Sequence, residues 1–387
     1  MTEPLVSTQQ AFKVLYRFQG HLDGARPQAE LVEANGKFYG TTTEGGSNAR
    51  QCFCGTVFSV DGSGNETVLY RFQGGNDGAT PEGSLLYLNG TFYGTTFAGG
   101  NSNYCGGGCG TLFALDASGQ EQVVHRFGGG NDGVRPSGRL VAYNGKIFGT
   151  TQGGGTFSCG CGTVFAFDPS TGQETPVYAF TGGNDGSVPL VGLTQIGKNL
   201  YGTTSGGGDP CGPGSCGSVF SINSSGSLRV VHTFTIRDGN YPSSNVVQVG
   251  TTLYGTTYDG GDGCVINGCG TIYAIDKSGN ERIVWLFGVD RDGEKPAGHL
   301  AVYNGTIYGT TEAGGNTTLC FGGRTLGCGT IFRFKPSIHL ETKLHAFSGP
   351  DGESPLGGVI ERGGLLYGTA YTGAIRSWGN VFLIGAK

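Results

Sequence analysis

The chain has 387 residues, of which 78 are glycine, and a formal net charge of -5 at pH 7. Basic and acidic residues are interspersed, which argues against a basic surface for nucleic acid, and no apolar run is long enough to span a membrane. The glycines have no collagen period. They recur in register with tyrosine, phenylalanine and aliphatic residues, which is typical of turns in a β protein.

Seven copies of a Tyr-Gly-Thr-Thr motif organise the sequence. They begin at Tyr39, Tyr93, Phe148, Tyr201, Tyr254, Tyr308 and Tyr367, and the last copy ends in alanine. The intervals are 54, 55, 53, 53, 54 and 59 residues. An uninterrupted repeat leaves no position for a domain boundary, because each unit needs its neighbours to bury its faces. We therefore predict one domain over residues 1–387.

Each repeat unit begins with Asp-Gly-x-x-Pro, at residues 23, 77, 132, 185, 238, 292 and 351. Eight residues after the proline come Asn-Gly in four copies and another glycine-containing pair in three. These dipeptides are typical of tight hairpin turns. In the first copy, residues 30–34 and 37–42 are expected to be the first two strands, with the innermost strand starting just after the proline.

A glycine-rich loop of variable length and two more strands complete the unit. The third strand begins with Gly-Thr-Val-Phe or a close variant, as in Gly55 to Phe58. A short Asp-x-Ser-Gly turn leads to a fourth strand that ends in phenylalanine, as Val68 to Phe72 does. Four antiparallel strands repeated seven times predict an all-β, seven-bladed β-propeller.

The last repeat has only three strands before the chain stops at Lys387. Residues 12–18 match the fourth strand of the first repeat and precede the first Asp-Gly. We therefore predict that this N-terminal strand becomes the outermost strand of the last blade and closes the ring. A solenoid would instead need polar caps at its ends.

The twelve cysteines form six close pairs, one in each of the first six repeats. The pairs are Cys52 and Cys54, Cys105 and Cys109, Cys159 and Cys161, Cys211 and Cys216, Cys264 and Cys269, and Cys320 and Cys328. Six local disulfides are the expected state, as in an oxidising compartment, although a ring with one intervening residue is strained. A metal site would add histidine or cluster four thiolates, so no metal is expected. Residues 1–10 lack a signal-peptide pattern, and we expect a secreted protein whose export signal has been removed.

The pattern Tyr-Gly-Thr-Thr-x-x-Gly-Gly followed by Gly-Thr-Val-Phe resembles the GloVer tandem repeat of secreted bacterial proteins. The resemblance covers nearly the whole chain. It implies a propeller fold, export and some form of cell-surface association, but it implies no particular activity. The cysteine pairs and the lack of a C-terminal anchor segment depart from the family pattern.

Two repeated polar features are interpreted as structural. The aspartate of each Asp-Gly can accept hydrogen bonds from its own turn, and one carboxylate per blade is too few for a Ca²⁺ site. His125, His232 and His345 lie two residues before the phenylalanine of the fourth strand, where other copies have tyrosine or tryptophan. We interpret them as packing residues. No nucleophile-elbow, Ser-His-Asp or phosphate-loop pattern is present, so neither a catalytic residue nor a cofactor is predicted.

Polar slots that differ from copy to copy predict where a ligand would bind. In a propeller, the link that enters the innermost strand and the loop between strands two and three lie on the same face. On that face, two positions of each repeat hold different residues from copy to copy: the position directly before the proline and the position three residues after it. The predicted ligand-binding residues in these slots are Arg26, Glu30, Arg135, Arg139, Tyr241, Asn245, Lys295 and His299. The basic members favour an anionic ligand such as an acidic sugar; the alternative is that these residues are merely solvated at a channel mouth.

The sequence favours a secreted, disulfide-braced binding or adhesion module for a glycan or protein ligand. One alternative is an extracellular hydrolase or lyase that acts on polysaccharide, with acidic groups that meet only in three dimensions. Another is the self-associating subunit of a surface fibre. No nucleic-acid partner and no membrane span are expected. Whether the protein is an enzyme stays open, because the sequence names no reaction.

Overall fold

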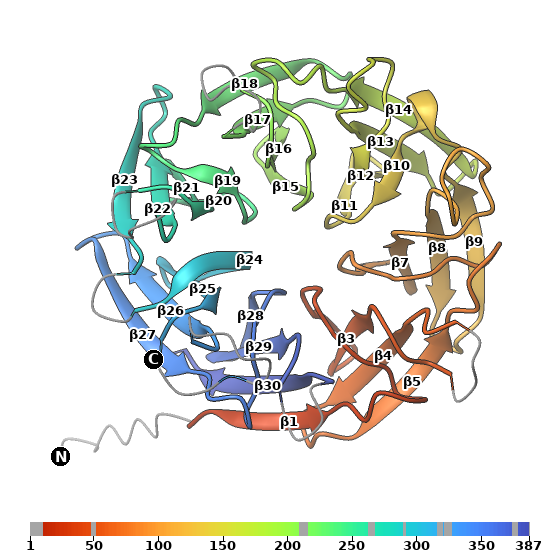
Figure 1. Ribbon diagram of the computed structural model, residues 1–387, viewed down its shortest axis with the longest axis horizontal. Helices are drawn as coiled ribbons and strands as arrows, with labels where there is room; N and C mark the ends of the chain where they lie inside the picture. The colour runs from red at the N-terminus through yellow and green to blue at the C-terminus, as the bar shows by residue number, and fades with distance from the viewer. Residues whose placement is uncertain are drawn as a thin grey trace.

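A computed structural model describes residues 11–47, 52–208, 216–261, 268–288, 292–315, 320, 327–373 and 378–386. Its strands form seven antiparallel sheets that stand like blades around a central axis (Figure 1). Apart from the 3-10 turn η1 (Gly130–Asp132), these ranges contain no helix, and therefore none that could cross a membrane. The prediction of a seven-bladed all-β propeller is confirmed.

The first four blades follow the chain order from the axis outward. Blade 1 contains β2 (Val32–Ala34), β3 (Lys37–Thr42), β4 (Thr56–Asp61) and β5 (Glu66–Arg71). Blade 2 contains β6 (Leu86–Leu88), β7 (Thr91–Thr96), β8 (Thr111–Asp116) and β9 (Glu121–Arg126). Blade 3 contains β10 (Val134–Pro136) and β11 (Val141–Tyr143), which both pair with β12 (Lys146–Gly153), then β13 (Thr163–Asp168) and β14 (Gln173–Ala179). Blade 4 contains β15 (Leu193–Ile196), β16 (Asn199–Thr204), β17 (Ser218–Ile222) and β18 (Leu228–Thr233).

The last three blades have the same order. Blade 5 contains β19 (Asn240–Pro242) and β20 (Val247–Val249), which both pair with β21 (Thr252–Asp259), then β22 (Thr271–Ile275) and β23 (Glu281–Leu286). Blade 6 contains β24 (Glu294–Tyr303), β25 (Thr306–Ala313), β26 (Thr330–Lys335) and β27 (Leu340–Ala346). Blade 7 contains β28 (Val359–Arg362), β29 (Leu365–Ala370), β30 (Asn380–Gly385) and β1 (Lys13–Arg17).

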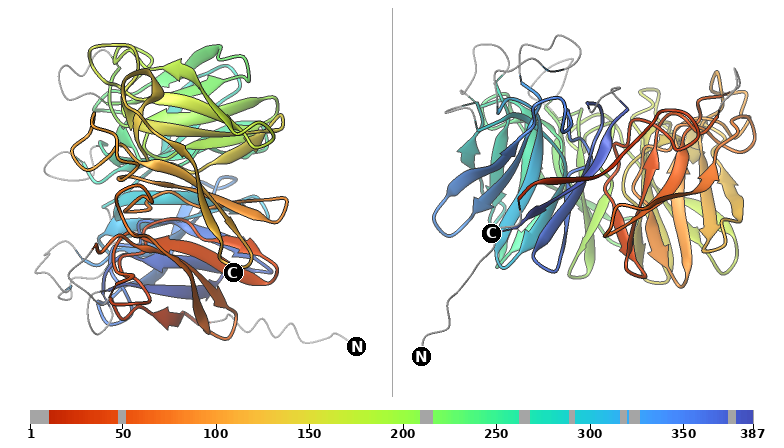
Figure 2. Two further views of the ribbon diagram at one scale, coloured as in Figure 1. Left: turned by 90° about the vertical axis from the view of Figure 1, so that its right-hand side faces the viewer. Right: turned by 90° about the horizontal axis from the view of Figure 1, so that it is seen from below.

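The N-terminal strand closes the ring as predicted. β1 pairs antiparallel with β30, with Lys13 opposite Leu383 and Arg17 opposite Asn380, and it lies along the outside of blade 7 (Figure 2). Just before β1, the ring of Phe12 stacks on His345 of blade 6 at a centroid distance of 3.8 Å. The two ends of the chain are therefore joined in one sheet.

The Tyr-Gly-Thr-Thr motif packs each second strand against the third strand of its own blade. A Cβ at Gly94 would lie 2.4 Å from Cζ of the fully buried Phe113, so only glycine lets these strands approach. The last threonine of the motif shares a hydrogen bond with the hydroxyl group that opens the third strand, as Thr96 does with Thr111 at 2.8 Å. Both hydroxyl groups are thereby satisfied in a dry core.

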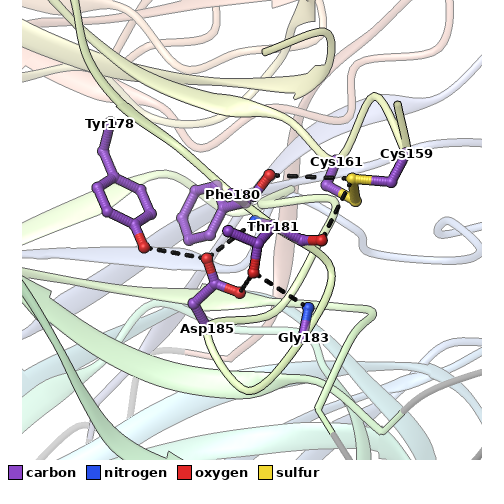
Figure 3. Close-up of a disulfide and its surroundings, with 7 residues drawn as sticks. All are labelled: Cys159, Cys161, Tyr178, Phe180, Thr181, Gly183 and Asp185. Atoms are coloured by element: carbon purple, nitrogen blue, oxygen red, sulfur yellow. Dashed lines mark hydrogen bonds between the residues drawn. A yellow bond between two sulfur atoms is a disulfide. The ribbon is translucent and has the colours of Figure 1, made fainter. Parts of the chain in front are cut away.

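The aspartate of each Asp-Gly fixes the link from one blade to the next, an arrangement that we call the aspartate clip. In blade 3, Asp185 accepts hydrogen bonds from the Tyr178 hydroxyl at 3.0 Å and from the backbone N–H of Thr181 at 2.9 Å (Figure 3). The Thr181 hydroxyl donates a third, at 2.5 Å. The clip confirms that the aspartate caps its own turn.

All seven links contain this clip. The aromatic partners lie 2.6–3.1 Å from their aspartates, and the pairs are Tyr16 with Asp23, Tyr70 with Asp77, His125 with Asp132, Tyr178 with Asp185, His232 with Asp238, Trp285 with Asp292, and His345 with Asp351. The three histidines thus use a ring nitrogen where other copies use a phenol or an indole. Their interpretation as structural residues is confirmed.

A second repeated contact, which we call the latch, joins each blade to the preceding one. The residue before each proline donates its backbone N–H to the carbonyl group of the residue before the glycine that opens strand three, as Thr80 does to Cys54 at 2.8 Å. A Cβ on that glycine, Gly55, would lie 2.7 Å from Pro81 Cδ. In blade 7, which lacks the cysteine pair, Trp378 supplies the carbonyl group to Arg26.

Candidate functional site

The Asp-Gly links and the cysteine loops lie on one face of the ring, which we call the loop face. The latch bonds join these two kinds of loop directly, so the prediction that they share a face is confirmed. The opposite face carries the hairpin turns between the first two strands of each blade. We call it the hairpin face.

Three adjoining hollows lie on the loop face. A central cavity of ≈ 140 Å³ is lined by residues from all seven blades. An apolar arm of ≈ 360 Å³ lies over blades 4 and 5 and shares Leu190, Val191 and Ser243 with the central cavity. A polar arm of ≈ 380 Å³ lies over blades 7, 1 and 2 and shares Gln28 and Glu82 with it. Together they cross the axis of the ring.

Three of the residues predicted to bind a ligand meet in the central cavity. The carboxylate of Glu30 from blade 1 lies 3.3 Å from Nη1 of Arg139 in blade 3, and 3.8 Å from Nδ1 of His299 in blade 6. The side chains of Glu30 and His299 are 9 % exposed, whereas that of Arg139 is 40 % exposed. A carboxylate, a guanidinium and an imidazole therefore converge on the axis from three blades.

His299 is the buried member of this cluster. Burial lowers its pKa, the Glu30 carboxylate opposes that shift, and the Arg139 guanidinium adds to it. Its Nδ1 is buried and has no hydrogen-bond partner among the described residues. A neutral imidazole with an unpaired ring nitrogen can exchange a proton or a hydrogen bond with a bound molecule.

The apolar arm has two tyrosines in its lining. Tyr241 is 39 % exposed and holds a left-handed backbone, with φ of 55°, because its N–H forms the latch to Cys216. Tyr258 donates its hydroxyl to Glu312 at 2.7 Å, and Nζ of Lys295 lies 4.5 Å from the centre of its ring. These contacts fix the ring of Tyr258 and the backbone of Tyr241 beside Leu190, which is also 39 % exposed.

The polar arm combines carboxylates, hydroxyl groups and two aromatic rings. Its lining includes Glu44, Glu82, Thr80, Phe53 and Tyr371. Burial raises the pKa of the Glu82 carboxyl to about 7, with Arg135 opposing the shift. Near neutral pH this group can therefore act either as a donor or as an acceptor.

The remaining predicted residues are placed differently. Arg26, Arg135 and Lys295 hold the latch position on the loop face. Asn245 is 4 % exposed, and its side chain accepts the N–H of Leu300 in blade 6 at 2.7 Å. Asn245 therefore ties two blades together and does not line the central cavity.

Three of the four basic residues predicted at the mouth of the loop face form ion pairs with neighbouring carboxylates. Arg26 pairs with Glu44 at 2.6 Å, Lys295 with Asp259 at 2.6 Å, and Arg139 with Glu30 at 3.3 Å. The guanidinium of Arg135 lies 5.2 Å from the centre of the Phe97 ring. The net positive charge of the mouth is thus smaller than the sequence indicated, and an anionic ligand stays a prediction that rests mainly on Arg135 and the partly exposed Arg139.

Several lining residues were missed by sequence reasoning, although a signal for them exists. Glu82 and Leu190 directly follow the proline of their repeats, and Tyr258 and Tyr371 directly follow the Tyr-Gly-Thr-Thr motif or its equivalent. Both slots vary among the copies as strongly as the two that were used. Applying the same criterion to every slot of the loop face would have identified them.

Two groups at the rim of the propeller bring together potential metal ligands. His125, Asp132 and Glu174 form one, and His232, Asp238 and Glu281 form the other, with ligand atoms within 4.8 Å of one another. The same aspartate and glutamate positions recur beside tyrosine or tryptophan in other links. There, Glu121 interacts electrostatically with Tyr70 and Asp77, and Glu341 interacts with Asp292. We therefore interpret both groups as variants of the aspartate clip.

The cysteines form local disulfides as predicted. The bonds Cys52–Cys54, Cys105–Cys109, Cys159–Cys161 and Cys320–Cys328 have Cα–Cα distances of 5.0–5.5 Å. Cys216 and Cys269 are also disulfide-bonded, whereas their predicted partners, Cys211 and Cys264, lie outside the described residues. The disulfides brace the loops whose carbonyl groups form the latches.

Fold and site together define a tandem-repeat β-propeller, closed by its own N-terminal strand, with a hollowed loop face. The sequence matches the family model of the Gloeobacter/Verrucomicrobia repeat over residues 5–212 and again over 209–382. The chain therefore belongs to the Gloeobacter/Verrucomicrobia repeat family, and the resemblance noted in the sequence is confirmed. No curated protein matches the sequence.

Solved structures of other propellers share the fold. An oligogalacturonate lyase from Vibrio parahaemolyticus aligns with a TM-score of 0.54 and 11% identity, over 99% of this chain and 95% of its own. A puromycin-hydrolyzing peptidase from Mycobacterium tuberculosis aligns with a TM-score of 0.56 and 12% identity, over 98% of this chain and 55% of its own. The extracellular domain of a putative one component system from B. thetaiotaomicron aligns with a TM-score of 0.57 and 8% identity, over 97% and 40%. Identities this low show the fold alone.

Proposed function

We propose that this protein is a secreted binding module that holds a glycan or protein ligand on its loop face. The observation that carries the proposal is that three adjoining hollows occupy one face and cross the axis. Their lining comes largely from slots that vary among the repeats, while the aspartates of the clips are the same in all seven repeats. Concave sites with a few convergent polar groups are where propellers and other scaffolds bind ligands.

Secretion is supported by the disulfides, which persist in oxidising compartments and are rare in the cytosol. Every latch described in blades 1–6 uses the carbonyl group of a disulfide-bonded cysteine. A loop face braced in this way keeps its hollows preformed, which reduces the entropy lost on binding.

An array of immobilised glycans and extracellular proteins tests this function. Wild type, Arg139→Ala and Tyr241→Ala are compared with Arg362→Ala, a matched control on the hairpin face whose side chain is 66 % exposed. We expect the array signal to fall with the first two variants and to stay unchanged with the control. Equal signals for all four proteins would remove the loop face from binding.

A second candidate function is cleavage of a polysaccharide. It is favoured by the convergence of Glu30, Arg139 and the neutral His299 in the central cavity, because such groups can move a proton and stabilise developing charge. Propellers with this fold include oligogalacturonate lyases. Incubation with neutral and uronate-containing polysaccharides, followed by detection of new chain ends, tests it. Cleavage that His299→Gln does not reduce would contradict a role for this cluster, and the absence of any product would dismiss the enzyme.

A further inference from the structure

A separate hollow of ≈ 500 Å³ lies on the hairpin face and is lined by residues of blades 2, 3 and 4. The turns at Asn89 and Asn144 border it, and Ser170, in the turn between β13 and β14, lies on its outer side. None of its lining residues belongs to the loop face. Ligand pockets are commonly about 300–1,000 Å³ in volume, so this hollow is large enough to hold a small molecule or part of a chain.

One slot of the repeat that borders the hollow holds a small residue, Ala142, in blade 3. At the junction of blades 1 and 2, the Tyr87 hydroxyl accepts a hydrogen bond from Nδ2 of Asn35 at 3.2 Å. In the next repeat, the residues at these two positions are Ala142 and Asn89. Alanine cannot reach the asparagine, and the space that Tyr87 occupies at the first junction stays open at the second. The two junctions therefore differ in the space between their blades, although both are built from the same repeat.

The lining of the hollow has no charged side chain and combines polar groups with apolar residues such as Leu88, Ala142 and Pro169. It contains the amides of Asn89, Asn144 and Gln195, the hydroxyl groups of Thr91 and Ser170, and the rings of Tyr93 and Tyr143. Amides and hydroxyl groups both donate and accept hydrogen bonds, whereas tyrosine rings offer flat apolar faces. A charged ligand would lose water here without meeting a counter-charge.

Tyr143 is held rigidly at this site. The residue is 7 % exposed, its hydroxyl donates to the backbone carbonyl of Lys198 in blade 4, and the centroid of its ring lies 5.7 Å from that of Phe148. Contacts across two blades thus fix part of the wall before any ligand arrives, which lowers the entropy lost on binding.

From these features we infer that the hollow on the hairpin face is a binding site for a neutral saccharide. The apolar face of a sugar ring packs on Tyr93, beside the edge of Tyr143 that borders the hollow, and the ring hydroxyl groups exchange hydrogen bonds with the amides of Asn89, Asn144 and Gln195. The site is independent of the loop face. A protein with both sites holds two ligands on opposite faces of the ring.

The variant Ala142→Tyr tests the inference by rebuilding the contact seen at the first junction. A tyrosine at position 142 fills the hollow. Its hydroxyl can accept a hydrogen bond from Asn89, as the Tyr87 hydroxyl does from Asn35. Calorimetric titration uses the full chain and three probes: a neutral glucan hexasaccharide, a galacturonate hexasaccharide and a glucosamine hexasaccharide. We expect the neutral probe to bind to wild type and not to Ala142→Tyr.

Two further variants keep the test decisive if the tyrosine disturbs folding. Gln195→Ala removes one amide from the wall and is expected to weaken binding of the neutral probe by about 3- to 10-fold, the effect of one lost hydrogen bond. Tyr87→Ala at the first junction is the matched control and leaves binding unchanged. Thermal melting confirms that each variant is folded.

The outcomes separate this site from the loop face. Binding of the neutral probe that survives Arg139→Ala but is lost in Ala142→Tyr supports the inference, even if the loop face binds nothing. The inference is overturned if the neutral probe does not bind, if only a charged probe binds, or if Ala142→Tyr and Gln195→Ala leave its binding intact.

Discussion

The rim and the centre of this propeller are built from the same repeat, but the residues at the rim are nearly the same in every copy whereas those at the centre differ. At the rim, all seven links contain an aspartate clip, and the aromatic partner changes only among tyrosine, histidine and tryptophan. At the centre, the equivalent slots hold residues as different as Glu30, Arg139 and His299. The comparison teaches that positions with the same residue in every copy are mainly those that hold the blades together. Positions whose residue differs from copy to copy are mainly those whose side chains are free to bind a ligand.

One residue per repeat belongs to both regions. The residue before each proline has a left-handed backbone, with φ between 50° and 58° in all seven copies, and its N–H forms the latch. Its side chain nevertheless varies from Arg26 to Val188 to Tyr241. The backbone at this position forms the hydrogen bond that joins two blades, while the side chain is free to contact a ligand.

Removal of the closing strand should have the largest effect on the rim. Deletion of residues 1–18 takes away Leu15 and Phe18, which are 9 % and 3 % exposed, and leaves β30 as an open edge. We expect the truncated chain to lose its cooperative thermal transition. If it melts at the temperature of the full chain, the N-terminal strand does not hold the ring closed.

Loss of one aspartate clip should destabilise the fold less than removal of the closing strand, but still substantially. Asp185→Ala removes three hydrogen bonds to a buried carboxylate and is expected to destabilise the fold by about 3 kcal/mol. Asp168→Ala, in an exposed turn of the same blade, is the matched control. Urea unfolding of both variants measures the difference. Equal destabilisation would show that the clip is no stronger than an ordinary turn.

The fold could be predicted well from the sequence because the repeated motifs mark where each strand and turn of a blade begins. The proline, the hairpin turn and the Tyr-Gly-Thr-Thr motif lie at fixed distances from one another within each repeat, and the last blade was the one that lacked a fourth strand, which residues 12–18 could supply. The site was predicted less well, because pairing across blades is invisible in a linear pattern. Nothing in the sequence shows that Arg26 meets Glu44, that Asn245 bonds to Leu300, or that Ala142 leaves a space.

The stability of the rim should also respond to pH. Five glutamates next to clip aspartates have a pKa raised chiefly by burial, to about 7 for Glu66, Glu121 and Glu281 and about 8 for Glu174 and Glu341. Because the folded protein holds these protons more tightly than the unfolded chain, their contribution is greatest at acidic pH. It is lost as pH rises through these values.

Stability should therefore fall between pH 5 and pH 8, a window set by the raised glutamate pKa values. Glu341→Gln, which replaces the carboxyl by an uncharged amide, is expected to flatten this decline while changing the melting temperature little at pH 5. Thermal melts of wild type and variant across the window provide the measurement. A wild-type protein that becomes more stable toward pH 8 would contradict the account.

The most direct test of the division between constant backbone and variable side chain compares Tyr241→Gly with Val188→Gly. Both changes relieve a left-handed backbone at the same slot and should alter stability by less than about 1 kcal/mol. Both proteins are applied to the array of glycans and extracellular proteins beside wild type. The account predicts that only Tyr241→Gly, whose ring lines the apolar arm, loses signal. Equal retention or equal loss of signal by the two variants would contradict it.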